Sequence, residues 1–180
     1  SAGLANVRVN DPRTDTTLDQ TTQSETTIAV SGKKVAVGFN DSQRVYPGGA
    51  LTAAANLTGV AYSTDGGRSF TDGGNLPSAS GQIHFGDPWL ASDRAGTFYF
   101  ADLSLSGESG GLEVAVATSK NGGKTWSGPS FASPNDPTLF YSGDKEAITV
   151  GRSKADPSKD AVYVAWDDFV FDQDGNFKDK

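Results

Sequence analysis

The 180-residue chain carries a net charge of −7, which argues against a nucleic-acid partner because phosphates select clustered lysines and arginines. It contains no cysteine, so a disulfide framework and thiol chemistry are excluded, and it has no apolar run of membrane-spanning length. Twenty-two glycines, together with 10 Phe, 5 Tyr and 3 Trp, favour strands joined by tight turns over helices. The composition therefore predicts an all-β globular domain.

The first 23 residues contain one short alternating run, Leu4 to Val9, which predicts a strand, followed by a polar stretch that predicts a surface loop. Two units of four strands follow, at residues 24–77 and 85–132, and an incomplete third unit at 143–180 holds two strands. The ten strands of these units are expected at 26–30, 34–39, 59–63, 68–72, 88–92, 97–103, 112–119, 124–127, 146–150 and 161–169.

One turn sequence occurs twice, 56 residues apart. The first copy is Ser63-Thr64-Asp65-Gly66-Gly67-Arg68-Ser69-Phe70, and the second is Ser119-Lys120-Asn121-Gly122-Gly123-Lys124-Thr125-Trp126. Asp-Gly and Asn-Gly supply the positive φ angles of tight strand-to-strand turns, and the aromatic residue is expected to pack beneath the turn. Both copies are therefore interpreted as structural turns.

These turns resemble the Asp box, S-x-D-x-G-x-x-W/F, of the sialidase-like BNR-repeat propellers. The motif positions retained in the two copies are Ser63, Asp65, Gly67, Phe70, Ser119, Gly123 and Trp126, with Asn121 standing in for the second Asp. Residues 24–169 also resemble secreted bacterial proteins described as exo-alpha-sialidases. The resemblance implies a secreted, six-bladed β-propeller, of which this chain would supply about two and a half four-stranded blades.

The spacing of the units agrees with propeller blades. First strands superpose at separations of 62 and 58 residues, and second strands at 63 and 64. The superposed residues are Ile28, Leu90 and Ile148 in the first strands and Gly38, Ala101 and Ala165 in the second. A propeller closes with about four to eight blades, so a second polypeptide or further blades are expected to complete the ring. The polar ending at 172–180 is typical of a protease-sensitive loop and suggests truncation or nicking.

Acidic residues recur where the chemistry of a propeller would lie. In an up-and-down blade the start of the first strand and the end of the second share one face, and the Asp boxes lie on the other. The candidate catalytic residues on the first face are Glu25, Asp41, Asp87, Asp144, Glu146 and Asp167, and the candidate ligand-binding residues are Arg44, Trp89, Asp102, Trp166 and Asp168. The acids could serve acid–base catalysis, hold a cation or bind sugar hydroxyls, or they could simply be solvated at strand ends.

Sialidase chemistry itself is not expected. The resemblance implies an arginine triad, a Tyr-Glu nucleophile pair and an Asp acid/base, with the first arginine in a Phe/Tyr-Arg-Ile-Pro motif on an inner strand. This chain reads Ser24-Glu25-Thr26-Thr27-Ile28 there, and Arg44 is the only arginine nearby. An acid at that position would repel a carboxylate, which argues against a sialic acid substrate.

Three functions remain open. The first is a secreted glycan-recognising propeller without sialidase turnover. The second is a glycoside hydrolase whose paired funnel carboxylates would lie about 5–5.5 Å apart if retaining, or about 6.5–9.5 Å apart if inverting. The third is a structural or protein-binding scaffold.

No cofactor is required by these readings, although a calcium site is possible. Asp172, Asp174 and Asn176 have the alternate spacing of a calcium loop around Gly175. His84 is the only histidine, which excludes a histidine-rich metal cluster, and it is expected to be a packed or surface residue.

Overall fold

The computed structural model describes residues 5–11, 13, 22–42, 55–79, 81–105, 111–132 and 138–178. These ranges contain ten β-strands and no α-helix, which confirms the all-β prediction. The strands are β1 (Gln23–Ser31), β2 (Lys34–Asp41), β3 (Thr58–Ser63), β4 (Thr71–Asn75), β5 (Ile83–Ser92), β6 (Phe98–Leu105), β7 (Leu112–Ser119), β8 (Ser127–Phe131), β9 (Leu139–Arg152) and β10 (Asp160–Asp172).

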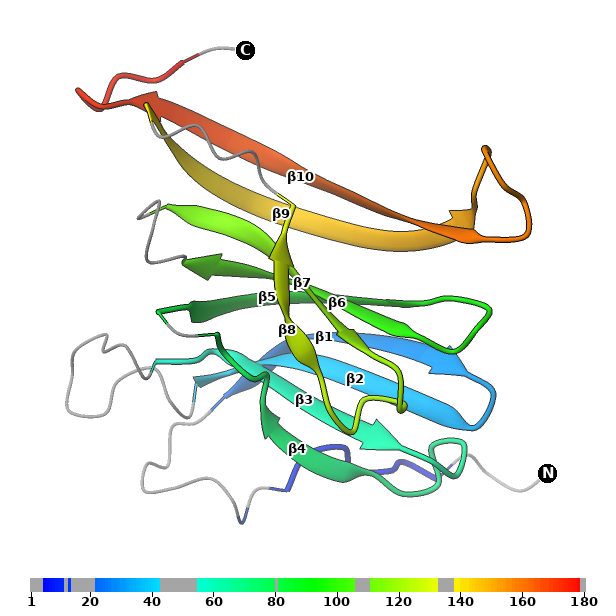
Figure 1. The fold of residues 1–180 in the computed structure, drawn as a ribbon. Coiled ribbons are helices and arrows are strands. Elements are labelled where there is room, and N and C mark those ends of the chain that lie inside the picture. Colours follow the sequence, from blue (N-terminus) through cyan, green and yellow to red (C-terminus); the bar gives the residue numbers. More distant parts are fainter. Residues whose placement is uncertain are drawn as a thin grey trace.

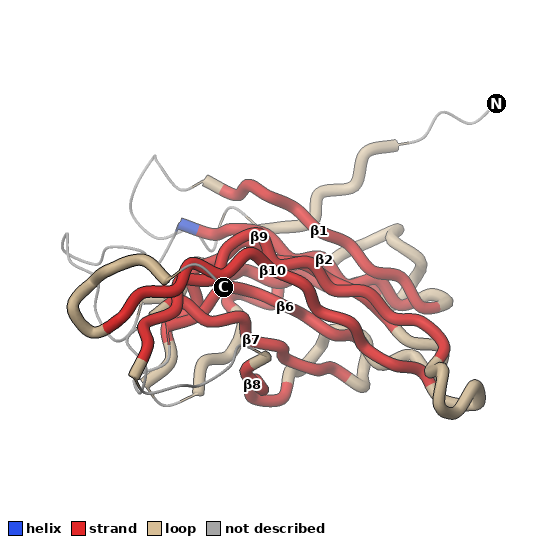
Figure 2. The backbone as a smooth tube through the Cα atoms, turned by 90° about the horizontal axis from the view of Figure 1, so that it is seen from above, coloured by secondary structure: helices blue, strands red, loops and turns tan. Residues whose placement is uncertain are grey.

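The strands form two four-stranded blades and a two-stranded third, all antiparallel within a blade (Figure 1). Blade 1 has the order β1-β2-β3-β4, and blade 2 has the order β5-β6-β7-β8. The hairpin β9–β10 begins blade 3 and is joined to blade 2 by one parallel pair, Leu112 with Ser142. Seen from above, most strands lie roughly along one axis, with loops gathered at their two ends (Figure 2). The architecture is that of a partial propeller.

Strand limits differ from the predicted ones in two systematic ways. The inner strands β5 and β9 begin earlier than predicted. Each contains a β-bulge whose sequence resembles a turn, but strand pairing continues on both sides of the bulge. The outer strands β4 and β8 begin three residues later, because each Asp-box turn extends through its aromatic residue. The strand predicted at Leu4 to Val9 is wrong for residues 5–9, which form no ladder and instead place Val9 against blade 1.

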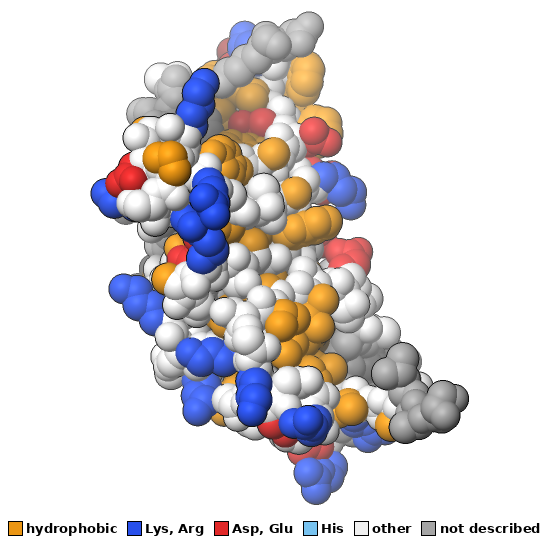
Figure 3. Space-filling view, turned by 90° about the vertical axis from the view of Figure 1, so that its right-hand side faces the viewer, with side chains coloured by type: hydrophobic (Ala, Val, Ile, Leu, Met, Phe, Trp, Pro, Cys, Tyr) orange, Lys and Arg blue, Asp and Glu red, His pale blue; other side chains and the backbone are white. Residues whose placement is uncertain are grey.

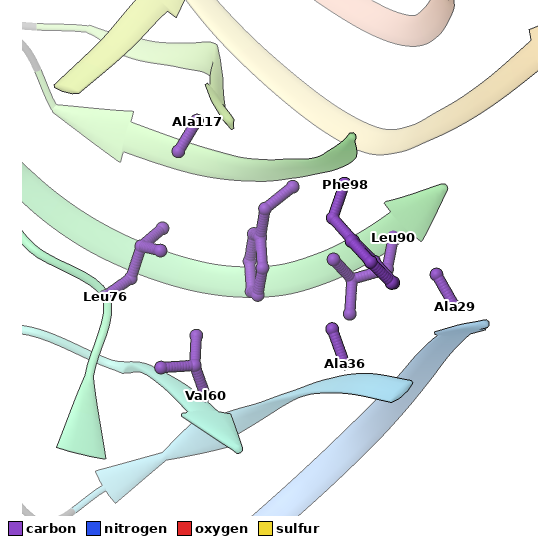
Figure 4. Packing of buried hydrophobic residues seen from close by; sticks show 8 residues of the cluster. Ala29, Ala36, Val60, Leu76, Leu90, Phe98 and Ala117 are labelled. Carbon is purple, nitrogen blue, oxygen red and sulfur yellow. The ribbon is translucent and has the colours of Figure 1, made fainter. Parts of the chain in front are cut away.

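The main core lies between blades 1 and 2 (Figure 4). Its buried side chains are Ala29, Ala36, Val60 and Leu76 from blade 1 with the following loop, and Leu90, Phe98, Phe100 and Ala117 from blade 2. Phe100 meets the ring of Trp126 edge-on, with centroids 5.4 Å apart. A Cβ on Gly38 would lie 2.7 Å from the Phe100 ring, so the small residue predicted on the second strand is required by packing. Burial of this surface fixes the inner strands β1 and β5 side by side.

Candidate functional site

The same backbone irregularity begins the inner strand of every blade. The bulges fall between Ser24 and Thr27 in β1, between Gly86 and Trp89 in β5, and opposite Ala165 and Asp167 in β9. Each bulge holds one non-glycine residue in the left-handed region: Glu25, Asp87 and Lys145, with φ of 51°, 52° and 52°. Such conformations are uncommon for residues other than glycine and are enriched at functional sites. Because β1 packs against β5 and β5 against β9, the three bulges adjoin.

Asn40, at the end of β2, links the first two bulges. Its side-chain oxygen accepts a hydrogen bond from the backbone N–H of Asp87 at 2.8 Å. Its Nδ2 donates to Glu25 Oε2 at 2.9 Å and, over a longer distance of 3.4 Å, to Asp87 Oδ1. Gly86 permits this approach, because a Cβ there would lie 2.3 Å from Asn40 Oδ1. The amide therefore clamps two carboxylates from neighbouring blades.

The Glu25 and Asp87 carboxyls lie close together, because the same Asn40 nitrogen donates to both. A hydrogen bond from the Asp87 side chain and its negative charge raise the pKa of Glu25, against a smaller lowering by Asn40 and Lys145. The negative charge of Asp87 thus disfavours the ionised form of Glu25.

Glu146 is the least compensated acid of the site. Its side chain is only 3% exposed, and neither carboxyl oxygen meets a donor on another described residue. Burial raises the pKa of Glu146 to about 8, and the charges of Asp102, Asp87 and Asp144 add to the effect. At neutral pH this group is mostly protonated and can donate a hydrogen bond.

Glu25, Asp87 and Glu146 line one cleft of about 390 Å³. Its lining consists of Glu25, Thr26, Asp87, Pro88, Trp89, Lys145, Glu146 and Ala147. Trp89 is 47% exposed, so one side of the cleft is a large, accessible indole. The cleft combines an apolar platform with carboxyl groups, which is the composition expected of a small-ligand site.

The other predicted site residues lie around or behind this cleft. The Asp144 side chain accepts a hydrogen bond from the Lys145 backbone N–H at 2.8 Å. In the backbone register of the β9–β10 hairpin, Asp144 lies opposite the exposed Asp167. Asp168 is half-buried with one oxygen, Oδ1, unbonded to any described residue. Trp166 is half-buried beside Gly143, and Asp41 is buried at the end of β2. None of these residues lines the cleft, and Arg44 lies outside the described residues.

Asp102 does not line the cleft either, because it is buried between blades. Its Oδ2 lies 2.5 Å from His84 Nδ1 and accepts a bond from Thr58 Oγ1 of blade 1 at 3.0 Å. Burial opposes protonation of His84, but its bond to Asp102 and the charge of that carboxylate raise the His84 pKa overall. Of the two expected positions for His84, packed or surface, the structure shows the packed one, since His84 is fully buried.

This buried group is not a nucleophilic triad. Ser104 Oγ lies 3.2 Å from the same nitrogen, Nδ1, that faces Asp102, whereas the other ring nitrogen faces the Pro77 carbonyl. A triad needs the hydroxyl and the carboxylate on opposite nitrogens of the imidazole. The cluster instead satisfies polar groups at the contact between blades 1 and 2.

The two Asp-box turns have the same internal bonding. Ser63 Oγ accepts from the Gly67 amide at 3.0 Å, and Ser119 Oγ accepts from the Gly123 amide at 2.9 Å. Asp65 Oδ1 bonds the amides of Arg68 and Ser69, and Asn121 Oδ1 bonds the amide of Thr125. Phe70 packs against the blade 1 core, as Trp126 does against Phe100. Both turns lie at the opposite strand ends from Asn40, so they are remote from the cleft.

The calcium prediction is not tested by this structure. Asp172 already accepts bonds from the backbone of Asp174 and Asn176, at 3.1 and 2.8 Å, and pairs with Lys178 at 2.8 Å. The Lys178 ammonium is the main cause that lowers the Asp172 pKa to about 2. Within the described ranges no group of three or more His, Cys, Asp or Glu side chains is arranged to hold a metal ion.

Sequence reasoning missed Asn40 as the clamp and Lys145 as a cleft residue. A signal for Lys145 was present, because separations of 62 and 58 residues lead from Glu25 to Asp87 and then to Lys145. Asn40 carried no comparable signal. Its role depends on the side-by-side packing of two blades.

No protein-family model matches the sequence, and no curated protein matches it. Solved structures do resemble the fold: a Hadza microbial sialidase is 15% identical over 85% of this chain, with a TM-score of 0.50. A glycosyl hydrolase from Bacteroides ovatus is 18% identical over 89%, with a TM-score of 0.51. A protein of unknown function from Dyadobacter fermentans is 15% identical over 89%, with a TM-score of 0.50.

This chain spans 33%, 52% and 55% of the lengths of those three proteins, respectively. Similarity at this identity concerns the fold, and it agrees with the blades described above. The fold is therefore that of part of a sialidase-like β-propeller. Across the described segments, no helix has the length and apolarity needed to cross a membrane.

Proposed function

We propose that this chain belongs to a secreted propeller that binds glycans in the cleft between the starts of β1, β5 and β9, without sialidase turnover. The observation that carries the proposal is the exposed Trp89 indole beside the hydrogen-bonding array of Glu25, Asn40 and Asp87. An aromatic face can stack on the apolar face of a sugar ring, and carboxyl and amide groups can bind its hydroxyls. Solved proteins of similar fold include a sialidase and a glycosyl hydrolase, which is consistent with a carbohydrate ligand.

Two features favour binding over sialidase chemistry. No arginine lies among the described residues that line the cleft, so a substrate carboxylate has no guanidinium to receive it. The Glu25 and Asp87 carboxyls both accept from one amide nitrogen, Asn40 Nδ2, at 2.9 and 3.4 Å. Hydrolases keep their two carboxyls about 5 Å or more apart so that a sugar carbon or a water fits between them.

A glycoside hydrolase remains the second candidate because of Glu146. A protonated acid near a carboxylate pair is the arrangement that separates acid and base roles in many hydrolases. A panel of chromogenic glycosides, with Glu25→Gln and Glu146→Gln variants, distinguishes the two functions. Turnover that both variants abolish would replace binding with hydrolysis as the function of the cleft.

Binding is tested by glycan-array screening followed by titration calorimetry on the positive sugars. Trp89→Ala is expected to weaken binding by about tenfold or more, because stacking on a sugar face is lost. Phe131→Ala is the matched control, since Phe131 is also exposed, at 39%, but lies on the outer strand β8. If no glycan binds, or if both variants weaken binding equally, the proposal fails and a protein-binding scaffold becomes the better reading.

We also propose that further strands complete the ring beyond β10. Among the described strands β10 ends its sheet, and Val162, Tyr163 and Phe169 on it are exposed. A long apolar edge of this kind normally pairs with another strand or is otherwise protected. Native and denatured mass spectrometry measures whether another polypeptide or another copy is bound, and a stable monomer of 18.7 kDa would contradict the proposal.

A further inference from the structure

The cleft is unusually rich in uncompensated acid for a site that would bind neutral sugars. Glu25, Asp87 and Glu146 all line it, and Lys145 is its one basic residue among the described ones. We propose that the cleft selects sugars that carry a free primary amine, whose ammonium group binds between the Glu25–Asp87 pair and Glu146. The inference rests on the glycan-binding function proposed above and names the substrate class.

The Glu25–Asp87 pair suits an ammonium ligand. Asn40 Nδ2 donates to both carboxyls, at 2.9 and 3.4 Å, and the negative charge of Asp87 raises the pKa of Glu25. An ammonium carries three donors and a positive charge, so it can bond both carboxyl groups and offset the repulsion between them. An N-acetylated or hydroxylated sugar offers neutral donors and cannot offset that repulsion.

Glu146 is the independent observation that points to a ligand. Glu146 is only 3% exposed, yet it lines the cleft. Neither of its carboxyl oxygens has a hydrogen-bond partner on another described residue. A buried carboxyl without a hydrogen-bond partner lowers the stability of the fold. Such a group needs an explanation, and a ligand that supplies the missing hydrogen bonds is one. A donor on a bound amino sugar would satisfy it.

The charged groups around these acids favour the same ligand. Glu146 faces Asp87 from β5, Asp102 from β6 and Asp144 from its own strand. Glu25 faces Asp87 and, more weakly, Lys145. Asp102 is partly offset by its pair with His84. The carboxyl groups outnumber the cations, so the site attracts a cationic sugar and repels a negatively charged, sialylated one.

The test compares glucosamine oligomers with N-acetylglucosamine oligomers of equal length, neutral glucose oligomers and a sialylated oligosaccharide, by calorimetry at pH 7. Glucosamine oligomers are expected to bind at least about tenfold more tightly than their N-acetylated counterparts. Repetition in buffers of different ionisation heat should show proton release for the amino sugar alone, since its ammonium displaces the proton held by Glu146.

Glu146→Gln is expected to reduce binding of glucosamine oligomers about tenfold and binding of N-acetylated oligomers less than twofold. Glu25→Gln serves as the second variant should Glu146→Gln not fold. Asp174→Asn, an exposed acid outside the cleft, is the matched control and should change neither.

Equal or tighter binding of the N-acetylated, neutral or sialylated oligomers would overturn the amine preference while leaving glycan binding intact. An equal loss from Asp174→Asn, or equally tight binding of a lysine tetrapeptide, would also overturn it, because general charge attraction would then explain the result. Absence of binding by every sugar would overturn the glycan-binding function itself.

Discussion

The two ends of the strands contain acids in opposite situations. At the end with the hairpin turns, the acids Asp65, Asp93, Asp156 and Asp160 accept hydrogen bonds from turn amides or from Arg94. At the end with the bulges, Glu25 and Asp87 face each other and Glu146 has no partner among the described residues. The difference separates structural acids from candidate functional ones, because a buried acid that lacks a protein partner is the group that a ligand can satisfy.

Basic residues sharpen the contrast. Those near the hairpin turns are all exposed: Lys33, Lys34, Arg68, Arg94, Lys120, Lys124, Arg152, Lys154 and Lys159. Figure 3 shows Lys and Arg side chains spread over this end of the molecule, with few acidic side chains between them. Lys145 is by contrast the one basic residue among the described residues that line the cleft.

The largest expected effect comes from the buried acid behind the cleft. Asp102→Ala leaves His84 and Thr58 without their partner in the interior, so the unfolding free energy should fall by about 3–5 kcal/mol. Urea denaturation measures the loss. Asp167→Ala, an exposed acid on β10, is the control and should change stability by less than about 0.5 kcal/mol. Equal effects would mean that Asp102 is not a structural acid.

The next effect is a pH dependence caused by Glu146. Its folded pKa of about 8 exceeds the ordinary 4.5, so its contribution to stability is present below pH 4.5 and is lost as pH rises through 8. Glu146→Gln stays neutral at every pH. We expect it to raise the unfolding free energy at pH 9 by up to about 5 kcal/mol and to leave it almost unchanged at pH 4.5.

Denaturation series between pH 4.5 and 9 check this expectation. Asp174→Asn is the control, because its side chain is exposed. A Glu146→Gln protein with the same pH dependence as the unmodified chain would show that Glu146 is solvated or paired in solution, and the contrast between the two ends would weaken accordingly.

The smallest effect concerns the Asp-box turns. Ser63→Ala and Ser119→Ala each remove a buried hydroxyl that accepts a turn amide, and each should cost about 1–2 kcal/mol. Glycan binding should stay within about twofold, because both turns lie at the other strand ends. Thr64→Ala, an exposed change in the same turn, is the stability control. A binding loss in either Ser variant would contradict the structural role of these turns.

The sequence by itself determined the local structure. Gly pairs with Asp or Asn specified the turns, alternation specified the strands, and repeated spacing aligned the three inner strands, because each of these depends on residues close together in the chain. The same spacing even equates Glu25, Asp87 and Lys145.

Only the tertiary structure decided what the acids do. Asp102 and Asp87 both follow strand patterns, yet packing of blade 2 on blade 1 buries the first against His84 and places the second beside Glu25. Glu146 reads as one acid among several in Gly143-Asp144-Lys145-Glu146, and it loses its solvent only when β9 packs on β5. The contacts between blades that hold these acids join residues 44 or 47 positions apart, so no local pattern could report them.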